Sequence, residues 1–213
     1  LEHEIAIMEQ EAILFPRGEF ALHVPQFIKE ILAQLTMEAR SSSEINQTSG
    51  VSVRMTINNL ESMLSNAEKR AVRLKEREIV PRISDLRALY ASTAGKIELE
   101  YAGEDKREEE VIERLTNRAV LKVFDRYFTL DALKPTIVSF ENRQGVEVSD
   151  EMPSSTYMEG LHGIPGLKEN LHVLAVDGNP GLTASAIEFV LEGLHLHQKL
   201  NKERIGGRYT YRV

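Results

Sequence analysis

Apolar residues recur every three or four positions over four long stretches of this 213-residue chain. The clearest stretch is 53–75, and similar stripes occupy 24–40, 104–127 and 183–199. Such spacing places the apolar side chains on one face of an α-helix. The pattern therefore predicts a mainly α protein in which four amphipathic helices supply most of the core.

Shorter elements are expected between and around these helices. Residues 2–14 and 133–140 show helical spacing, and a short helix is expected to begin near Pro81, because proline is tolerated in a first helical turn. Residues 96–101 alternate polar and apolar, which fits either a short exposed strand or a continued helix. The segment 205–211 is expected to be a mobile end or a small edge strand.

Composition limits the classes of protein that this chain can belong to. No run of about 18 apolar residues is present, so no membrane span is predicted. The absence of cysteine excludes disulfides and thiolate metal sites, and the net charge of -7 disfavours nucleic-acid binding. We expect a cytoplasmic protein without a membrane or nucleic-acid partner. The first residues are not a signal peptide, and because they lie inside a helical pattern and lack Met, we expect a piece of a longer protein.

The residue types that commonly perform catalysis or bind metals do not occur in recognisable patterns. No Gly-Lys-Ser or Gly-Lys-Thr phosphate loop is present. His195 and His197 point to different helix faces, and His162 and His172 lack carboxylates at zinc-like spacing. Residues 154–156 (Ser-Ser-Thr) resemble a helix start more than a nucleophile. We therefore predict neither a catalytic residue nor a metal site.

Two clusters of charge need no function to explain them, and the acidic one is interpreted as solvated surface. The basic cluster at the end of the third long helix complements the negative end of the helix dipole. Either cluster could also contact the opposite cluster of another subunit. The acidic cluster consists of Glu98, Glu100, Glu104, Asp105 and 108–110, and the basic cluster of Lys69, Arg70, Arg73, Lys75 and Arg77.

One arginine stands at an unusual position. Ser49, Gly50 and Ser52 form a small-residue loop with helix-capping oxygens, and Arg54 follows in the first helical turn. A cation there opposes the helix dipole, whose positive end lies at the N-terminus. An anionic partner explains such an arginine better than helix stability does.

Residues 24–98 resemble the C-terminal helical lid of an AAA+ ATPase of the MoxR and magnesium-chelatase I-subunit group. Residues 52–57 (Ser-Val-Arg-Met-Thr-Ile) are similar to the sensor-2 pattern of that group, and 80–86 (Val-Pro-Arg-Ile-Ser-Asp-Leu) to the start of its last lid helices. The longer string 43–96 resembles a prokaryotic ChlI-like subgroup. Members of that subgroup carry a helical C-terminal extension, to which 104–213 are similar.

The resemblance implies a division of the chain and a role for Arg54. Residues 1–22 would connect to an absent ATPase core, 23–98 would form the lid, and 99–213 the helical extension. Arg54 would be the nucleotide-sensing arginine that contacts the terminal phosphate of ATP, in its own subunit or a neighbouring one. ATP and Mg²⁺ would be cofactors of the full-length protein only, because the phosphate loop, the Mg²⁺-binding strand and the arginine finger would lie upstream. This chain alone would neither hydrolyse ATP nor bind it tightly.

The resemblance also implies partners. The full-length protein would be a homo-hexamer that remodels a client or inserts a metal such as magnesium, working with a von Willebrand A-domain partner. A different hypothesis is a stand-alone helical interaction module without any link to an ATPase. A transcription regulator is a third, which the acidic charge balance disfavours.

Overall fold

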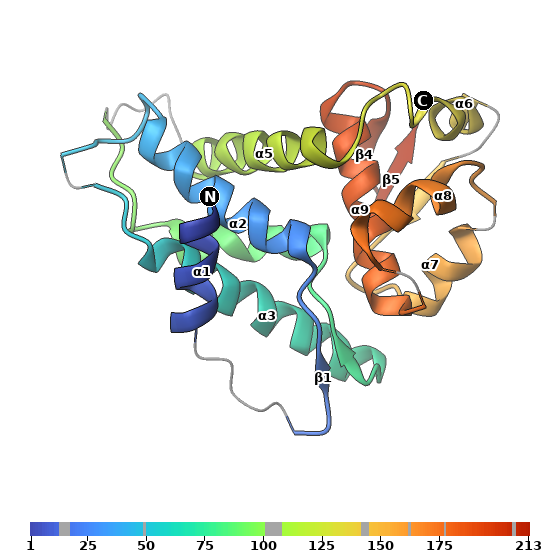
Figure 1. Ribbon diagram of the computed structural model, residues 1–213, viewed down its shortest axis with the longest axis horizontal. Helices are drawn as coiled ribbons and strands as arrows, with labels where there is room; N and C mark the ends of the chain where they lie inside the picture. The colour runs from blue at the N-terminus through green and yellow to red at the C-terminus, as the bar shows by residue number, and fades with distance from the viewer. Residues whose placement is uncertain are drawn as a thin grey trace.

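The computed structural model describes residues 1–12, 18–48, 50–100, 108–141, 145–161, 163–176, 178–205 and 208–213. Within these residues the protein has nine α-helices, two short 3₁₀ helices and two small sheets (Figure 1), which confirms the predicted mainly α class. None of the helices in this part of the chain is long and apolar enough to cross a membrane.

The first part of the chain forms a helical bundle. Its helices are α1 (Glu2–Glu11), α2 (Gln26–Ser41) and α3 (Arg54–Leu74), so the predicted helices are confirmed to within a few residues. The helix expected after Pro81 begins as a 3₁₀ helix, η1 (Ile83–Ala88), and continues as α4 (Leu89–Thr93).

Two very short parallel strands join the ends of the α2–α3 pair. Strands β1 (Ala21–Leu22) and β2 (Glu78–Ile79) pair directly, with Ala21 opposite Glu78. Parallel strands need a long crossover connection, which α2 and α3 provide here. The pairing places the start of α2 beside the segment that follows α3.

The second part of the chain is also helical. The predicted helices at 104–127 and 133–140 correspond to α5 (Glu108–Tyr127) and α6 (Lys134–Glu141), with 104–107 outside the described residues. Helix α9 (Pro180–Leu196) begins earlier than expected, because Pro180 occupies its first turn and the Asn179 side chain accepts a hydrogen bond from the Leu182 amide at 2.8 Å. Between α6 and α9 lie α7 (Ser154–Leu161), α8 (Leu167–Leu171) and η2 (His172–Leu174).

A three-stranded antiparallel sheet completes this part. It consists of β3 (Val146–Val148), β4 (Asn201–Ile205) and β5 (Arg208–Arg212) in the order β3-β5-β4. Of the two alternatives for 205–211, the strand is confirmed for 208–211, but its expected place at an edge is wrong, because β5 is the central strand. Residues 206 and 207 lie outside the described residues. Of the two alternatives for 96–101, the continued helix is also wrong, since Leu99 forms an isolated antiparallel bridge with Ile45.

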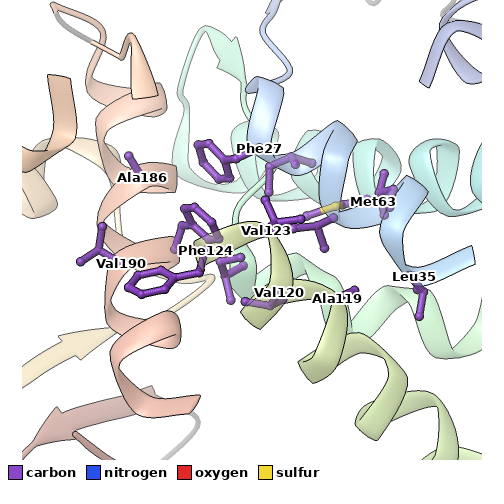
Figure 2. Packing of buried hydrophobic residues seen from close by; sticks show 14 of the residues in the cluster. Phe27, Leu35, Met63, Ala119, Val120, Val123, Phe124, Ala186 and Val190 are labelled. Atoms are coloured by element: carbon purple, nitrogen blue, oxygen red, sulfur yellow. The ribbon is translucent and has the colours of Figure 1, made fainter. Parts of the chain in front are cut away.

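The hydrophobic core is continuous through both parts. Helix α5 extends along the bundle and reaches α9 (Figure 1), and side chains of α2, α5 and α9 meet there (Figure 2). The rings of Phe27 and Phe189 stack with centroids 4.5 Å apart, and Phe124 meets Phe189 edge-on at 5.9 Å. Helix α9 is buried on almost all sides. The boundary between a lid (23–98) and an extension (99–213) stays a prediction. The hydrophobic core continues across this boundary.

Candidate functional site

Arg54 lies at the first residue of α3, with its side chain exposed. Its backbone amide donates to Ser52 Oγ at 3.3 Å. Gly50 adopts a φ of 66°, a left-handed conformation that favours glycine. Ser49 is outside the described residues. Within the described part of the chain the Arg54 guanidinium makes no hydrogen bond or ion pair. An anion that approached this helix end would meet a guanidinium and the positive end of the helix dipole.

Buried and half-buried contacts hold the loop that precedes Arg54. Arg40 of α2 donates from Nε to the Val51 carbonyl at 2.9 Å and from Nη1 to Glu4 at 2.8 Å. Thr56, in the first turn of α3, donates to the same Glu4 carboxylate at 2.7 Å. Helices α1 and α2 therefore fix both the loop and the start of α3, and this arrangement positions Arg54.

The far end of α3 carries a buried ion pair. Arg70 is only 3% exposed and contacts the fully buried Asp85 of η1. Burial acts to lower the pKa of Arg70, but the Asp85 carboxylate raises it above its ordinary value. Arg70 is therefore wrongly placed among the cations that could meet an acidic cluster of another subunit, because its side chain points into the protein. Lys69, Lys75 and Arg77 are exposed, and the half-exposed Arg73 donates to the Asp150 carbonyl at 2.7 Å.

Arg82 connects this ion pair to α7. Its backbone amide donates to Asp85 at 2.8 Å, and its guanidinium donates to the Met152 carbonyl at 2.8 Å and to Ser154 Oγ at 2.7 Å. The same guanidinium lies 4.9 Å from the centre of the Tyr157 ring. Ser154 is the first residue of α7, so the interpretation of 154–156 as a helix start is confirmed.

Glu188 of α9 is a second buried charge, next to Arg82. Its carboxylate accepts hydrogen bonds from the Ser84 amide at 2.7 Å and from the Tyr157 hydroxyl at 2.5 Å. Burial raises the pKa of Glu188 above its ordinary value, although the charge of Arg82 and these hydrogen bonds act in the opposite direction.

Glu188→Gln is expected to make the free energy of unfolding less dependent on pH. A carboxyl whose pKa is higher in the folded state binds more protons there, so folded stability falls as pH rises from the ordinary glutamate pKa, about 4.3, through the folded value. Glutamine releases no proton, so the variant should gain stability relative to wild type across that window. Urea denaturation at pH 5 and pH 8 measures this. The prediction would be contradicted if the free energies of unfolding of variant and wild type differed by the same amount at both pH values. The exposed Glu159→Gln serves as the control.

A cavity of about 380 Å³ lies beside Glu188, between η1, α5, α9 and the three-stranded sheet. The buried carboxylates of Glu188 and Glu192 line its inner part, together with Tyr211 and Lys202. None of the sequence motifs considered above predicted this cavity. The available signal was the pair of glutamates four residues apart, because they interrupt the most apolar helix of the chain and share one face of it.

None of the described histidines lines this cavity, and among the described members of the acidic cluster only Glu109 does. His195 Nδ1 contacts the Leu200 carbonyl at 3.0 Å, and His197 Nε2 contacts Asp125 at 2.7 Å. His162 is outside the described residues, as are Glu104 and Asp105 of the acidic cluster, whose members Glu98, Glu100, Glu109 and Glu110 are exposed. Among the described residues, no three His, Asp or Glu side chains are grouped so as to hold a metal ion.

Two features of this structure can carry a function: the exposed Arg54 at the start of α3, and the cavity with buried carboxylates. Similarity to characterised proteins adds no further constraint. Comparisons of the chain with models of protein families, with curated proteins and with solved structures found no match.

Proposed function

We propose that this chain is the helical lid and C-terminal extension of an AAA+ ATPase of the MoxR and magnesium-chelatase I-subunit type. In this proposal Arg54 senses the nucleotide, and an upstream core holds ATP and Mg²⁺. The observation that carries the proposal is the exposed Arg54 side chain at the first turn of α3, without an ion pair in the described part of the chain.

The chemistry of Arg54 suits a phosphate group. A cation at a helix N-terminus is disfavoured by about 0.3–1 kcal/mol through the helix dipole. A phosphate that binds there makes the interaction favourable, because it is attracted by both the guanidinium and the positive end of the helix dipole. A guanidinium also donates two parallel hydrogen bonds to phosphate oxygens, which gives the contact a defined geometry.

The buried contacts at the far end of α3 support a coupling role. Arg70 joins α3 to Asp85, and Arg82 joins the Asp85 segment to Ser154 of α7. A displacement of α3 would therefore be transmitted to the residues of the extension. In a homo-hexamer this connection would transmit the nucleotide state to a bound partner, such as a von Willebrand A-domain protein, and so drive client remodelling or metal insertion.

Arg54→Ala in the full-length protein is expected to lower steady-state ATPase turnover about tenfold or more, as removal of one charge-stabilising contact does in other enzymes. The matched control is Arg77→Ala, because Arg77 is exposed and lies beyond the other end of α3, a helix about 30 Å long. Unchanged turnover in a stably folded Arg54→Ala protein would defeat the sensor assignment. The alternative of a stand-alone helical module predicts that the full-length protein has no ATPase activity.

A further inference from the structure

We propose that helix α7 is a lid that detaches from α9 while the rest of the protein stays folded, and that the charge on Glu188 controls this opening. The proposal is independent of the proposed ATPase function, because it concerns how one helix is attached within this chain. Its basis is that the buried side chains of α7 bind two buried charges, which are incompletely compensated while α7 covers them.

Little of α7 is buried, and the helix lies at the edge of the molecule (Figure 1). Of the side chains from 154 to 160, only those of Ser154 and Tyr157 are buried, Met158 is half-buried and the others are exposed. A surface helix normally buries an apolar stripe that repeats every three or four residues. Within these residues the attachment of α7 therefore depends mostly on one serine and one tyrosine.

Charged groups hold both of these residues. The Ser154 amide donates to Glu76 at 2.6 Å, and its Oγ accepts from Arg82 at 2.7 Å. The Tyr157 hydroxyl donates to Glu188 at 2.5 Å, and the Arg82 guanidinium lies over its ring. Arg82 and Glu188 are each 1% exposed. The attachment of α7 thus depends on two buried charges.

The closed position leaves Arg82 incompletely satisfied. Its Nε is one of three buried side-chain atoms in the described part of the chain that have no hydrogen-bond partner. The guanidinium contacts the Met152 carbonyl, Ser154 and the Tyr157 ring, all in α7 or just before it. Detachment of α7 would therefore admit water to Arg82, and water supplies the missing acceptor. The Glu188 oxygen that now accepts from Tyr157 would be hydrated as well.

The packing around α7 also favours its movement. A cavity of about 420 Å³ is lined by residues of α7, α9 and β3, among them Tyr157, Gly160, Ile187 and Val146. Protein interiors are normally packed without such voids. Helix α7 therefore loses fewer contacts on leaving than a closely packed helix would.

Tyr157 has a second partner that keeps α7 attached when Glu188 is neutral. Its hydroxyl lies 3.2 Å from the Ser149 carbonyl, to which it can donate, and accepts from the Ser149 amide at 3.1 Å. A protonated Glu188 can then donate to the Tyr157 oxygen, so each of these groups keeps a hydrogen bond. Ionisation of Glu188 returns the Tyr157 hydrogen bond to the carboxylate but places a charge in the interior.

A rise in pH is therefore expected to open α7. Burial raises the pKa of Glu188 in the closed position, whereas hydration in the open position returns it towards the ordinary value, about 4.3. The closed position consequently binds more protons. The free energy of opening therefore falls as pH rises through the closed-state pKa of Glu188.

Other charged or titratable side chains face Glu188 or the cavity beside it, so their effects must be separated from its own. Arginine and lysine side chains stay charged between pH 5.5 and pH 8. Tyr157 and Tyr211 stay neutral, because burial raises the pKa of both hydroxyls. The nearby carboxylates are unchanged in Glu188→Gln, so this variant isolates Glu188. Besides the two tyrosines, the surrounding side chains are Arg70, Glu76, Arg82, Asp85 and Arg87, Glu109 and Glu113 of α5, Glu192 of α9, and Lys202, Arg204 and Tyr209 of the sheet.

Hydrogen exchange of the intact chain at pH 5.5 and pH 8, followed by mass spectrometry, tests the proposal. After correction for intrinsic exchange rates, α7 amides should be protected at least about tenfold less than α9 amides, because α7 opens without global unfolding. Protection of α7 should fall at least about threefold from pH 5.5 to pH 8. In Glu188→Gln this fall should disappear.

Two further variants test the opening itself. Tyr157→Phe removes a hydrogen bond to a charged group, so α7 protection should fall at least about tenfold, while the exposed Ser155→Ala leaves it unchanged. Ile31→Val in the core of the bundle should lower α9 protection several-fold but leave that of α7 unchanged, since α2 stays folded when α7 opens.

Three results would overturn the proposal. The first is an equal loss of protection in α7 and α9 in Ile31→Val, which would mean that α7 opens only by global unfolding. The second is a pH dependence of α7 protection that persists in Glu188→Gln. The third is unchanged α7 protection in Tyr157→Phe.

Discussion

Asp85→Ala is expected to lower the free energy of unfolding by about 3–5 kcal/mol, the usual cost of removing one partner from a buried ion pair. Asp85 is fully buried and accepts hydrogen bonds from Arg70, from Asn66 and from the Arg82 amide. The variant would leave the Arg70 guanidinium buried without a counter-charge. Since domains are typically stable by about 5–15 kcal/mol, this one change removes a large share of the total. Thermal unfolding should show a Tm lower by about 6–20 °C.

Arg70 and Asp85 are also expected to contribute to the free energy of unfolding as a coupled pair. Arg70→Met combined with Asp85→Leu should be less destabilising than Asp85→Ala alone, because no unpaired charge remains in the interior. Arg73 is on the same helix but 49% exposed at the side chain. Arg73→Ala should therefore cost less than about 1 kcal/mol. Strictly additive effects of the two core substitutions would contradict the assignment of a coupled buried pair.

Gly193→Ala is expected to destabilise the protein by about 3 kcal/mol, at the upper end of the usual cost of overpacking a core. A Cβ atom at Gly193 would overlap Cδ2 of Phe124, far inside van der Waals contact. The Phe124 ring cannot easily move aside, because Phe128 and Phe189 surround it, with ring centroids 5.1 and 5.9 Å away. Glycine at this position therefore allows α9 to approach α5 closely.

Chemical denaturation of a double variant tests this explanation. Phe124→Leu reduces the side chain that meets the new methyl group, so Gly193→Ala should cost less in that background than in wild type. The control is Gly160→Ala in α7, where an added Cβ meets no neighbouring atom and should stabilise the helix by up to about 1 kcal/mol. Equal costs of Gly193→Ala in both backgrounds would show that contact with Phe124 is not the cause.

Long amphipathic helices were predictable from the sequence, whereas short elements were not. Helices α2, α3 and α5 each bury one apolar face, so the helical period of about 3.6 residues is visible in them. Strands β1 and β2 have two residues each, and α8 has five, which is too short to establish any period. Strand β5 shows alternation, but its central place in the sheet depends on the distant β3.

The same distinction applies to the candidate sites. Arg54 was identified because its conflict with the helix dipole is local and needs no knowledge of the fold. Arg70 and Arg82 look like ordinary surface cations in the sequence, since the groups that bury them lie far away along the chain. The cavity is formed by residues of η1, α5, α9 and the sheet, and only the pair Glu188 and Glu192 indicated it locally.

The order of strands in the three-stranded sheet has a consequence for synthesis of the protein. Its central strand, β5, pairs with β3 from much earlier in the chain and supplies Tyr211 to the cavity. Helices rich in local contacts form quickly, while pairing between distant segments is slow. During translation the helices can therefore assemble before residue 208 has emerged from the ribosome, whereas the cavity cannot. The cavity is therefore complete only after Tyr211 has been synthesised and β5 has paired with β3.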